Sequence, residues 1–144
     1  MKVIVITDDC QGMLFNNRRQ SKDKMLRKEI INLCKNKILY MNEYSYNQFE
    51  SSEKEEVMIR VSESFLRDVN MDAGKNIDDG YCLVENENLT DYVDDINEIV
   101  MFKWNTKYPA DMYFDIDLNR FQLVVTKDFQ GNSHNKITME IYKR

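Results

Sequence analysis

The stretch RFQLVVTKDFQGNSHNKITMEIYKR, residues 120–144, contains two segments rich in β-branched and aromatic residues. They are separated by QGNSHN, a short polar sequence that includes Gly131. No helix-forming sequence lies between the two segments, so we predict that they pair as an antiparallel β-hairpin. Any sheet formed by the preceding residues therefore has an antiparallel edge at this hairpin.

Before the hairpin, short apolar runs alternate with segments of helical periodicity. The runs predicted as strands are residues 2–7, 37–41, 57–61, 81–85 and 98–104. Strands that alternate with helices are typical of parallel pairing through right-handed crossovers. The first helix is expected to begin at Ser21, a good N-cap, with Asp23 in its first turn. A second helical stripe is expected from Leu89 to Ile96.

These patterns predict an α/β fold with a mostly parallel mixed sheet, helices on both faces and a C-terminal antiparallel hairpin. The 144 residues suffice for one domain with a substantial core. Gly and Pro are scarce, at 4 and 1, and no repeat, low-complexity tract or linker divides the sequence. We therefore expect a single domain over residues 1–144.

Charge and composition argue against some classes of function. The net charge is −5 and the pI is about 5.0, so general nucleic-acid binding is not expected, because phosphate neutralisation requires a basic face. No apolar run approaches the ~20 residues that span a bilayer. The 3 cysteines are isolated from one another, which suits free thiols in a reducing compartment. The sequence favours a cytoplasmic protein without membrane contact.

The order of the elements resembles that of dihydrofolate reductase, most clearly over Glu98–Arg144. In this region a strand precedes a loop with a D-x-x-F element, which is matched by Asp111 and Phe114. An aromatic-led strand follows, and a final strand ends in E-I-Y-x-R. The resemblance covers nearly the whole chain and implies a dihydrofolate reductase-like fold.

The N-terminal residues agree with this resemblance. Asp8, Gly12 and Asn16 or Asn17 are similar to the family's mobile loop D-x-x-x-G-x-x-x-N, which closes over the active site. The terminal stretches also resemble a small, divergent bacterial family of unknown function that is sometimes labelled ribonuclease Z. A dinuclear zinc hydrolase needs several histidine ligands, and His134 is the only histidine, so no metal site is expected.

The resemblance implies a catalytic carboxylate at the start of the first helix, where it orients the pterin and assists its protonation. Asp23, in QSKDK, matches this carboxylate by position. Burial would raise its pKa toward neutrality, which suits an acid. The alternative is an acid that only stabilises the helix dipole. The sequence favours this alternative, because the preceding loop lacks the family's Pro-Trp.

The resemblance also implies a groove for NADPH, but several residues at its positions are unfavourable. Ser45 can cap a short helix and donate to a phosphate, and Ser62 is a second position of the groove. Glu43 has the wrong charge beside a pyrophosphate. Glu85 and Asn86 replace a Gly-Gly pair whose backbone approaches the cofactor in the family. Conventional NADPH binding is therefore disfavoured.

The contacts expected for dihydrofolate are also depleted. ESSEKEE stands where the family has an arginine for the folate carboxylate, and a phenylalanine replaces a strand threonine. The loop before the first helix has gained cations, and arginines beside helix-end amides favour an anion. A solvated basic edge explains these charges equally well. The predicted ligand contacts are Gly12, Asn17, Arg18, Arg19, Phe102 and Trp104.

Three functions follow from these observations. The leading one is a divergent dihydrofolate reductase-fold protein without standard reductase activity, which binds an anionic small molecule or nucleotide in the ancestral cleft. The second is an NADPH-dependent reductase of a pterin-like substrate, with Asp23 as the proton donor. The third is a non-catalytic interaction protein. Because fold alone is weak grounds for function, the sequence leaves the ligand, catalysis and oligomeric state open.

Overall fold

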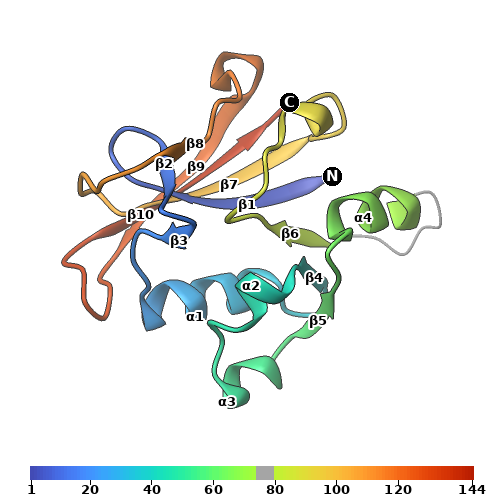
Figure 1. Ribbon diagram of the computed structural model, residues 1–144, viewed down its shortest axis with the longest axis horizontal. Coiled ribbons are helices and arrows are strands. Elements are labelled where there is room, and N and C mark those ends of the chain that lie inside the picture. Colours follow the sequence, from blue (N-terminus) through green and yellow to red (C-terminus); the bar gives the residue numbers. More distant parts are fainter. Residues whose placement is uncertain (74–79) are drawn as a thin grey trace.

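A mixed sheet forms the centre of the molecule, with the strand order β5-β4-β6-β1-β7-β10-β9 (Figure 1). The computed structural model describes the backbone of residues 1–73 and 80–144 and the side chains of residues 1–70 and 80–144. The strands of the sheet are β1 (Lys2–Thr7), β4 (Ile38–Met41), β5 (Met58–Val61), β6 (Tyr81–Leu83), β7 (Glu98–Lys103), β9 (Gln122–Phe129) and β10 (Ile137–Lys143).

The pairing of these strands confirms the predicted mixture of directions. β1 pairs in parallel with β6 and β7, and β4 pairs in parallel with β5 and β6. β10 is antiparallel to both β7 and β9, so the C-terminal hairpin adds an antiparallel edge to a parallel sheet. The five apolar runs predicted as strands are all strands, and they form the parallel part.

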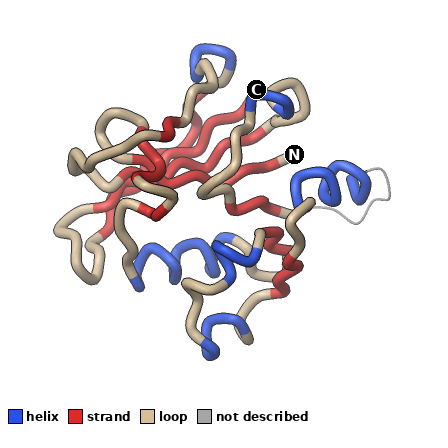
Figure 2. The backbone as a smooth tube through the Cα atoms, in the orientation of Figure 1, coloured by secondary structure: helices blue, strands red, loops and turns tan. Residues whose placement is uncertain are grey.

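Helices cover both faces of the sheet, as predicted (Figure 2). The helices are α1 (Lys24–Leu33), α2 (Glu43–Tyr46), α3 (Ser51–Lys54) and α4 (Phe65–Ala73). Successive side chains of β1 enter two separate apolar clusters. Ile4 belongs to the cluster that contains Leu26 and Ile30 of α1, whereas Val3 belongs to the cluster that contains Phe65 of α4. This alternation follows from the two-residue period of a strand.

Two expected helix positions were wrong. The N-cap of α1 is Asp23 rather than Ser21, because the Asp23 carboxylate accepts a hydrogen bond from the Met25 N–H and its backbone is extended. The stripe from Leu89 to Ile96 contains only a short 3-10 helix, η1 (Thr90–Tyr92). Both apolar ends of the stripe are buried, but turns alone are sufficient to bury them.

The polar stretch before α1 forms a second, smaller sheet. Its order is β3-β2-β8, with β2 (Gly12–Phe15), β3 (Arg18–Arg19) and β8 (Met112–Tyr113). Asn16 and Asn17 connect β2 to β3 with φ angles of 51° and 60°. Two consecutive left-handed residues are characteristic of a type I′ hairpin turn, which asparagine tolerates well. The sequence predicted only a loop here.

A short 3-10 helix, η2 (Leu118–Arg120), leads into β9 and completes the regular elements of the described chain. Within residues 1–73 and 80–144, every helix is too short or too polar to cross a membrane.

Candidate functional site

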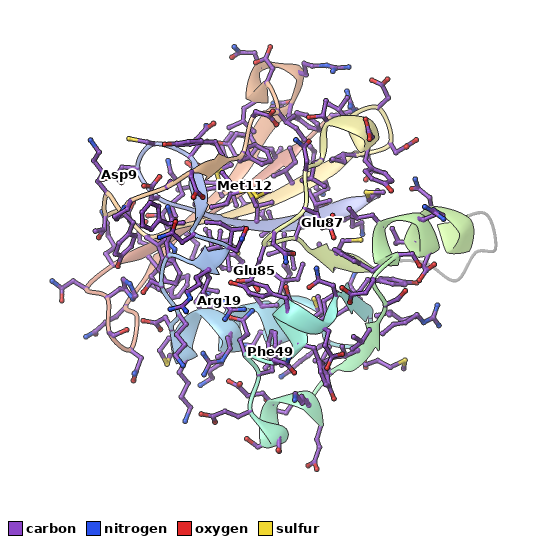
Figure 3. The ribbon with its side chains drawn as sticks, viewed as in Figure 1. Asp9, Arg19, Phe49, Glu85, Glu87 and Met112 are labelled. Atoms are coloured by element: carbon purple, nitrogen blue, oxygen red, sulfur yellow. The ribbon has the colours of Figure 1, made fainter. Side chains whose placement is uncertain are left out.

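Arg19 of β3 and Glu85, two residues after the end of β6, form a bidentate ion pair (Figure 3). The Arg19 Nε–Glu85 Oε2 distance is 3.0 Å, and the Nη2–Oε1 distance is 3.2 Å. The guanidinium also donates to the Tyr44 carbonyl and lies 4.5 Å from the centroid of the Tyr44 ring. The Gln48 side-chain amide also donates a hydrogen bond to the Glu85 carboxylate, at Oε1, over 2.8 Å.

This ion pair is largely withdrawn from water. The Glu85 side chain is only 5% exposed, against 22% for Arg19. Burial lowers the pKa of the Arg19 guanidinium, but the hydrogen bond and charge of Glu85 outweigh burial, so the net shift is upward. Arg19 is therefore fully charged and neutralised within the protein. The ion pair with Glu85 attaches the N-terminal hairpin to the central sheet.

The residues around this pair are closely packed. A cavity of about 10 Å³ remains, lined by Ile6, Met13, Arg19, Gln20, Ser21, Glu85 and Trp104. A space of this size holds about one water molecule at most. Phe102 is completely buried and Trp104 is 3% exposed. A ligand therefore has no surface of Phe102 to contact in this conformation, and very little of Trp104. The predicted roles of both residues as ligand contacts stay predictions.

The Asp23 carboxylate binds the turn between β9 and β10. Oδ1 accepts from the backbone N–H groups of Met25 and Asn132, each at 2.8 Å. Oδ2 accepts from the backbone N–H of Ser133 at 2.9 Å and lies 2.9 Å from His134 Nδ1. The carboxylate is thus both the cap of α1 and the anchor of a turn that is distant in sequence.

Hydrogen bonding sets the protonation of Asp23. Burial raises the pKa of this carboxyl, but donors from Asn132, His134, Ser133 and Met25 together outweigh burial and hold the pKa well below its usual range. A carboxyl that stays ionised at neutral pH is a poor proton donor. The assignment of Asp23 as a catalytic acid remains a prediction, and this geometry weighs against it.

His134 extends the contacts of Asp23 to the next loop. Its ring stacks on Trp104 with centroids 4.4 Å apart. Its Nε2 atom lies 3.0 Å from both the Ser21 hydroxyl and the Tyr108 hydroxyl. We define Ser21, Asp23, Trp104, Tyr108 and His134 as the His134 cluster. Nothing local in the sequence reveals this cluster, because Asp23 and His134 are separated by 111 positions.

Protein groups occupy the polar positions of the expected cofactor groove. Asn42, rather than Ser45, caps α2, accepting from the Ser45 N–H at 3.1 Å. The Asn42 amide also donates to Asn86 Oδ1 at 2.7 Å. A carboxylate oxygen of Glu63 accepts from the Glu43 N–H at 3.0 Å. Side-chain oxygens therefore satisfy N–H groups that an incoming phosphate would need.

The two serines predicted for the cofactor groove have different surroundings. Ser45 is completely buried, and within the described chain its hydroxyl has no hydrogen-bond partner. The Ser62 hydroxyl lies 3.0 Å from the Ser64 hydroxyl and accepts from the Ser64 N–H. Neither hydroxyl is arranged around an obvious phosphate position, and their cofactor roles stay predictions.

Open grooves lie around the N-terminal hairpin. The Arg18 groove, of about 520 Å³, is lined by Phe15, Asn16, Arg18, Arg19, Gln20, Tyr108 and Pro109. A neighbouring groove of about 490 Å³ shares Tyr108 and is lined by Trp104, Asn105, Thr106, Ser133, His134, Asn135 and Lys136. A third, of about 610 Å³, is lined by Leu14, Asn17, Tyr44, Asn86, Asp111 and Met112.

The predicted ligand residues are thus distributed over several places. Arg18 and Arg19 line one groove, and Asn17 lines another. Gly12 is buried, and a Cβ atom at this position would lie 2.5 Å from Ala110 Cβ, so close packing requires glycine there. Among the described residues, no group of three or more His, Cys, Asp or Glu side chains is placed to hold a metal ion.

Comparison with known proteins identifies the architecture. No family model and no curated protein matches the sequence. The structure is similar to dihydrofolate reductase from Enterococcus faecalis, solved in complex with NADP(H) and RAB-propyl, with a TM-score of 0.66. The alignment covers 99% of this chain and 95% of that chain, at 12% sequence identity. The chain has a dihydrofolate reductase-like fold.

At this identity the likeness extends to the fold alone. The comparisons give no support for the small bacterial family or for the ribonuclease label suggested by the terminal stretches. The dihydrofolate reductase-like architecture predicted from the sequence is confirmed. Function has to be argued from the residues of the grooves.

Proposed function

We propose that this protein binds a small anionic molecule that carries an aromatic group, such as a nucleotide, in the Arg18 groove, and that it does not act as a standard dihydrofolate reductase. The observation that supports this function is the placement of Arg18. It lines an open groove and forms no ion pair with any residue of the described chain. Arg19, beside it, is neutralised by Glu85.

The walls of the Arg18 groove suit the two parts of such a ligand. A guanidinium presents several N–H donors in one plane, which match phosphate or carboxylate oxygens. Phe15 is 42% exposed on one side of the groove, and Tyr108 contributes a second aromatic ring. Aromatic rings favour the flat face of a base or a similar ring. A volume of about 520 Å³ is within the usual range of small-molecule sites.

The groove is held open by hydrogen bonds between its two walls. Asp8 accepts from the Gly12 N–H at 2.7 Å on the hairpin side and from the Tyr108 N–H at 3.0 Å on the other side. Gln20 donates to the Pro109 carbonyl at 3.3 Å. The backbone around Gly12, Gln20 and Tyr108 is therefore held in place before a ligand arrives, which lowers the entropy cost of ordering the walls on binding.

The closed centre of the cleft favours this groove over the ancestral site. A cavity of about 10 Å³ is far too small for a pterin ring. A nicotinamide cofactor would meet the carboxylates of Glu63 and Glu85 where it needs N–H groups and open backbone. Repulsion between like charges at such positions costs several kcal/mol.

Titration calorimetry with AMP as the probe tests this function. We expect wild-type protein to bind AMP, with inorganic phosphate binding more weakly because it lacks the ring. Arg18→Ala should weaken AMP binding at least about tenfold, because it removes a charge-assisted hydrogen bond to the anion. Arg67→Ala is the matched control, since it removes an exposed arginine of α4 that does not line the groove.

Two results would contradict the proposal. One is the failure of AMP, ATP and inorganic phosphate to bind at all. The other is tight NADPH binding that Asp23→Ala abolishes, since this result would favour the reductase alternative. Arg18→Ala should leave any NADPH binding of that kind unchanged, so the two functions are distinguishable in the same experiment.

A further inference from the structure

Ser21, His134 and Asp23 form a continuous series of polar contacts within the His134 cluster. The Ser21 Oγ atom lies 3.0 Å from His134 Nε2, and His134 Nδ1 lies 2.9 Å from Asp23 Oδ2. Both distances are those of hydrogen bonds. A hydroxyl, an imidazole and a carboxylate in this order are the groups of a serine nucleophile, its general base and the residue that orients the base. Such a site is recognised by its geometry, because the order of its residues along the chain differs between folds.

The Asp23 carboxylate determines which nitrogen of His134 can act as a base. An ionised carboxylate only accepts hydrogen bonds, so the Nδ1 atom that faces it carries a proton. In a neutral imidazole the other nitrogen, Nε2, then has a free lone pair. The Ser21 hydroxyl lies at this nitrogen and donates its hydrogen bond there. His134 is therefore oriented to take the proton of Ser21.

The contact with His134 is not needed to satisfy the Asp23 carboxylate. Its two oxygens already accept three backbone N–H groups, from the first turn of α1 and from the β9–β10 turn. The Asp23 side chain is completely buried and that of His134 is 8% exposed. The His134 ring also stacks on Trp104, which fixes the plane of the ring. This packing preorganises both the base and the residue that orients it.

Tyr108 places a second hydroxyl at the same nitrogen, beside an open groove. Its Oη atom also lies 3.0 Å from His134 Nε2. A single lone pair cannot accept two well-aligned hydrogen bonds, so while Ser21 donates to Nε2, the Tyr108 hydroxyl can donate to another acceptor. Tyr108 and His134 both line the groove of about 490 Å³, a volume that suits a small molecule. A carbonyl oxygen that enters this groove can accept from Tyr108, and Ser21 is only half-buried.

We propose that this protein hydrolyses small carboxylic esters, with Ser21 as the nucleophile, His134 as the general base and Tyr108 as the donor to the carbonyl oxygen. Asp23 is a positioning residue that stays ionised throughout. Donation from a hydroxyl to the carbonyl oxygen stabilises the negative charge that develops there during attack. The inference does not rest on the proposed ligand binding, since Arg18 takes no part in it.

The reaction proceeds in two balanced halves. Ser21 Oγ forms a bond to the ester carbonyl carbon while His134 Nε2 takes the hydroxyl proton. The bond to the alkoxide then breaks, and Nε2 gives this proton to the departing alcohol. In the second half His134 takes a proton from water, the water oxygen bonds to the acyl carbon, and the proton returns to Ser21 as the carboxylic acid leaves. One ester and one water molecule become one acid and one alcohol.

The first experiment treats the full-length chain with a fluorophosphonate, which phosphonylates activated serines, and locates the adduct by peptide mass spectrometry. Wild-type protein should gain one phosphonyl group, on Ser21, and Ser21→Ala should gain none. Ser52→Ala removes an exposed serine of α3 and is the matched control, which should react like wild type. A wild-type chain that is not phosphonylated, or an adduct that persists in Ser21→Ala, would overturn the proposal.

Hydrolysis of 4-nitrophenyl acetate measures turnover in the same variants. Wild type and Ser52→Ala should hydrolyse the ester equally fast. Ser21→Ala should be at least about a hundredfold slower, because it removes the nucleophile. Circular dichroism verifies that each variant is folded. Equal rates for wild type and a folded Ser21→Ala would contradict the assignment of the nucleophile.

The ring of His134 gives an independent test, because it is the only histidine and its two nitrogens can be followed by 15N NMR. In mildly alkaline buffer we expect the proton on Nδ1. Asp23→Asn should move it to Nε2, because the amide can turn an N–H group toward Nδ1, and loss of stability alone does not cause this change. A wild-type ring with its proton on Nε2 would overturn the proposal, since that nitrogen could not accept from Ser21. A proton that stays on Nδ1 in Asp23→Asn would contradict the positioning role of Asp23.

Discussion

His134 Nδ1 lies 2.9 Å from Asp23 Oδ2, and this contact ties the β9–β10 turn to the start of α1. The same carboxylate caps the helix through the Met25 N–H and receives two backbone N–H groups from the turn. Asp23, to which the resemblance assigns an acid–base role, therefore has a structural role in this fold. It holds together two elements from opposite ends of the chain.

Asp23→Asn should destabilise the fold by roughly 3 kcal/mol, because one oxygen acceptor becomes an N–H donor facing other N–H donors. Asp115→Asn is the control, as its side chain is exposed and makes no hydrogen bond with the described residues. Urea denaturation followed by tryptophan fluorescence measures the difference, since Trp104 stacks on His134. Equal midpoints for the two variants would mean that Asp23 is not the anchor described above.

Acid should remove the contribution of Asp23. The pKa of its carboxyl is lower in the folded state than the ordinary value of 3.8, so the unfolded chain binds a proton more readily. The stabilisation is therefore complete above the ordinary value and is lost as pH falls below about 4. The difference in unfolding free energy between wild type and Asp23→Asn should be constant near neutrality and shrink in this acidic range. If this free-energy difference instead grew as the pH fell, the pKa of Asp23 would be raised rather than lowered in the folded state.

The Arg19–Glu85 pair predicts a strongly non-additive pair of substitutions. Arg19→Met should cost about 3–5 kcal/mol, because it leaves the Glu85 carboxylate buried and unpaired. Adding Glu85→Gln should recover a large part of this loss, since no charge is then buried without a partner. A double-mutant cycle by chemical denaturation measures the coupling. Simple additivity would show that the two side chains do not depend on each other.

Much of the architecture was predictable because it follows from local patterns. The apolar runs of β1 and β4 are too short for helices, and the hairpin of β9 and β10 has no helix between its strands. Those features, with the order of the elements, predicted the mixed sheet and the dihydrofolate reductase-like fold. The errors arose where local signals compete, as at α1, where Ser21 and Asp23 are both good caps.

The candidate site was less predictable, because its important contacts are long-range. Arg18 and Arg19 are adjacent and chemically identical in sequence, yet one lines an open groove and the other is neutralised by Glu85, 66 residues away. Glu85 was interpreted as an obstacle to a cofactor, and its pairing with Arg19 was not foreseen. Tyr108 and His134 were also missed as a pair, since neither has a neighbouring motif that indicates their contact.

Thiol labelling should distinguish the cysteines by burial. Cys34 and Cys82 are buried, and burial raises the pKa of each thiol to about 12, whereas Cys10 is exposed. An aromatic disulfide reagent at neutral pH should therefore modify one thiol in the folded protein and all three in urea. Cys10→Ser should abolish the reaction of the folded state. Rapid modification of three thiols without denaturant would contradict the burial of the other two.

The turn at Asn16 and Asn17 links backbone geometry to the proposed ligand groove. Both residues have positive φ angles, and glycine adopts such angles without the strain that a β-branched side chain incurs. Asn17→Gly should therefore retain both stability and AMP binding. Asn17→Val should cost about 1–2 kcal/mol and weaken AMP binding several-fold, because the strained turn displaces the adjacent Arg18. Denaturation and calorimetry on the two variants give both quantities. Unchanged AMP binding in a destabilised Asn17→Val variant would mean that the hairpin does not position Arg18 for the ligand.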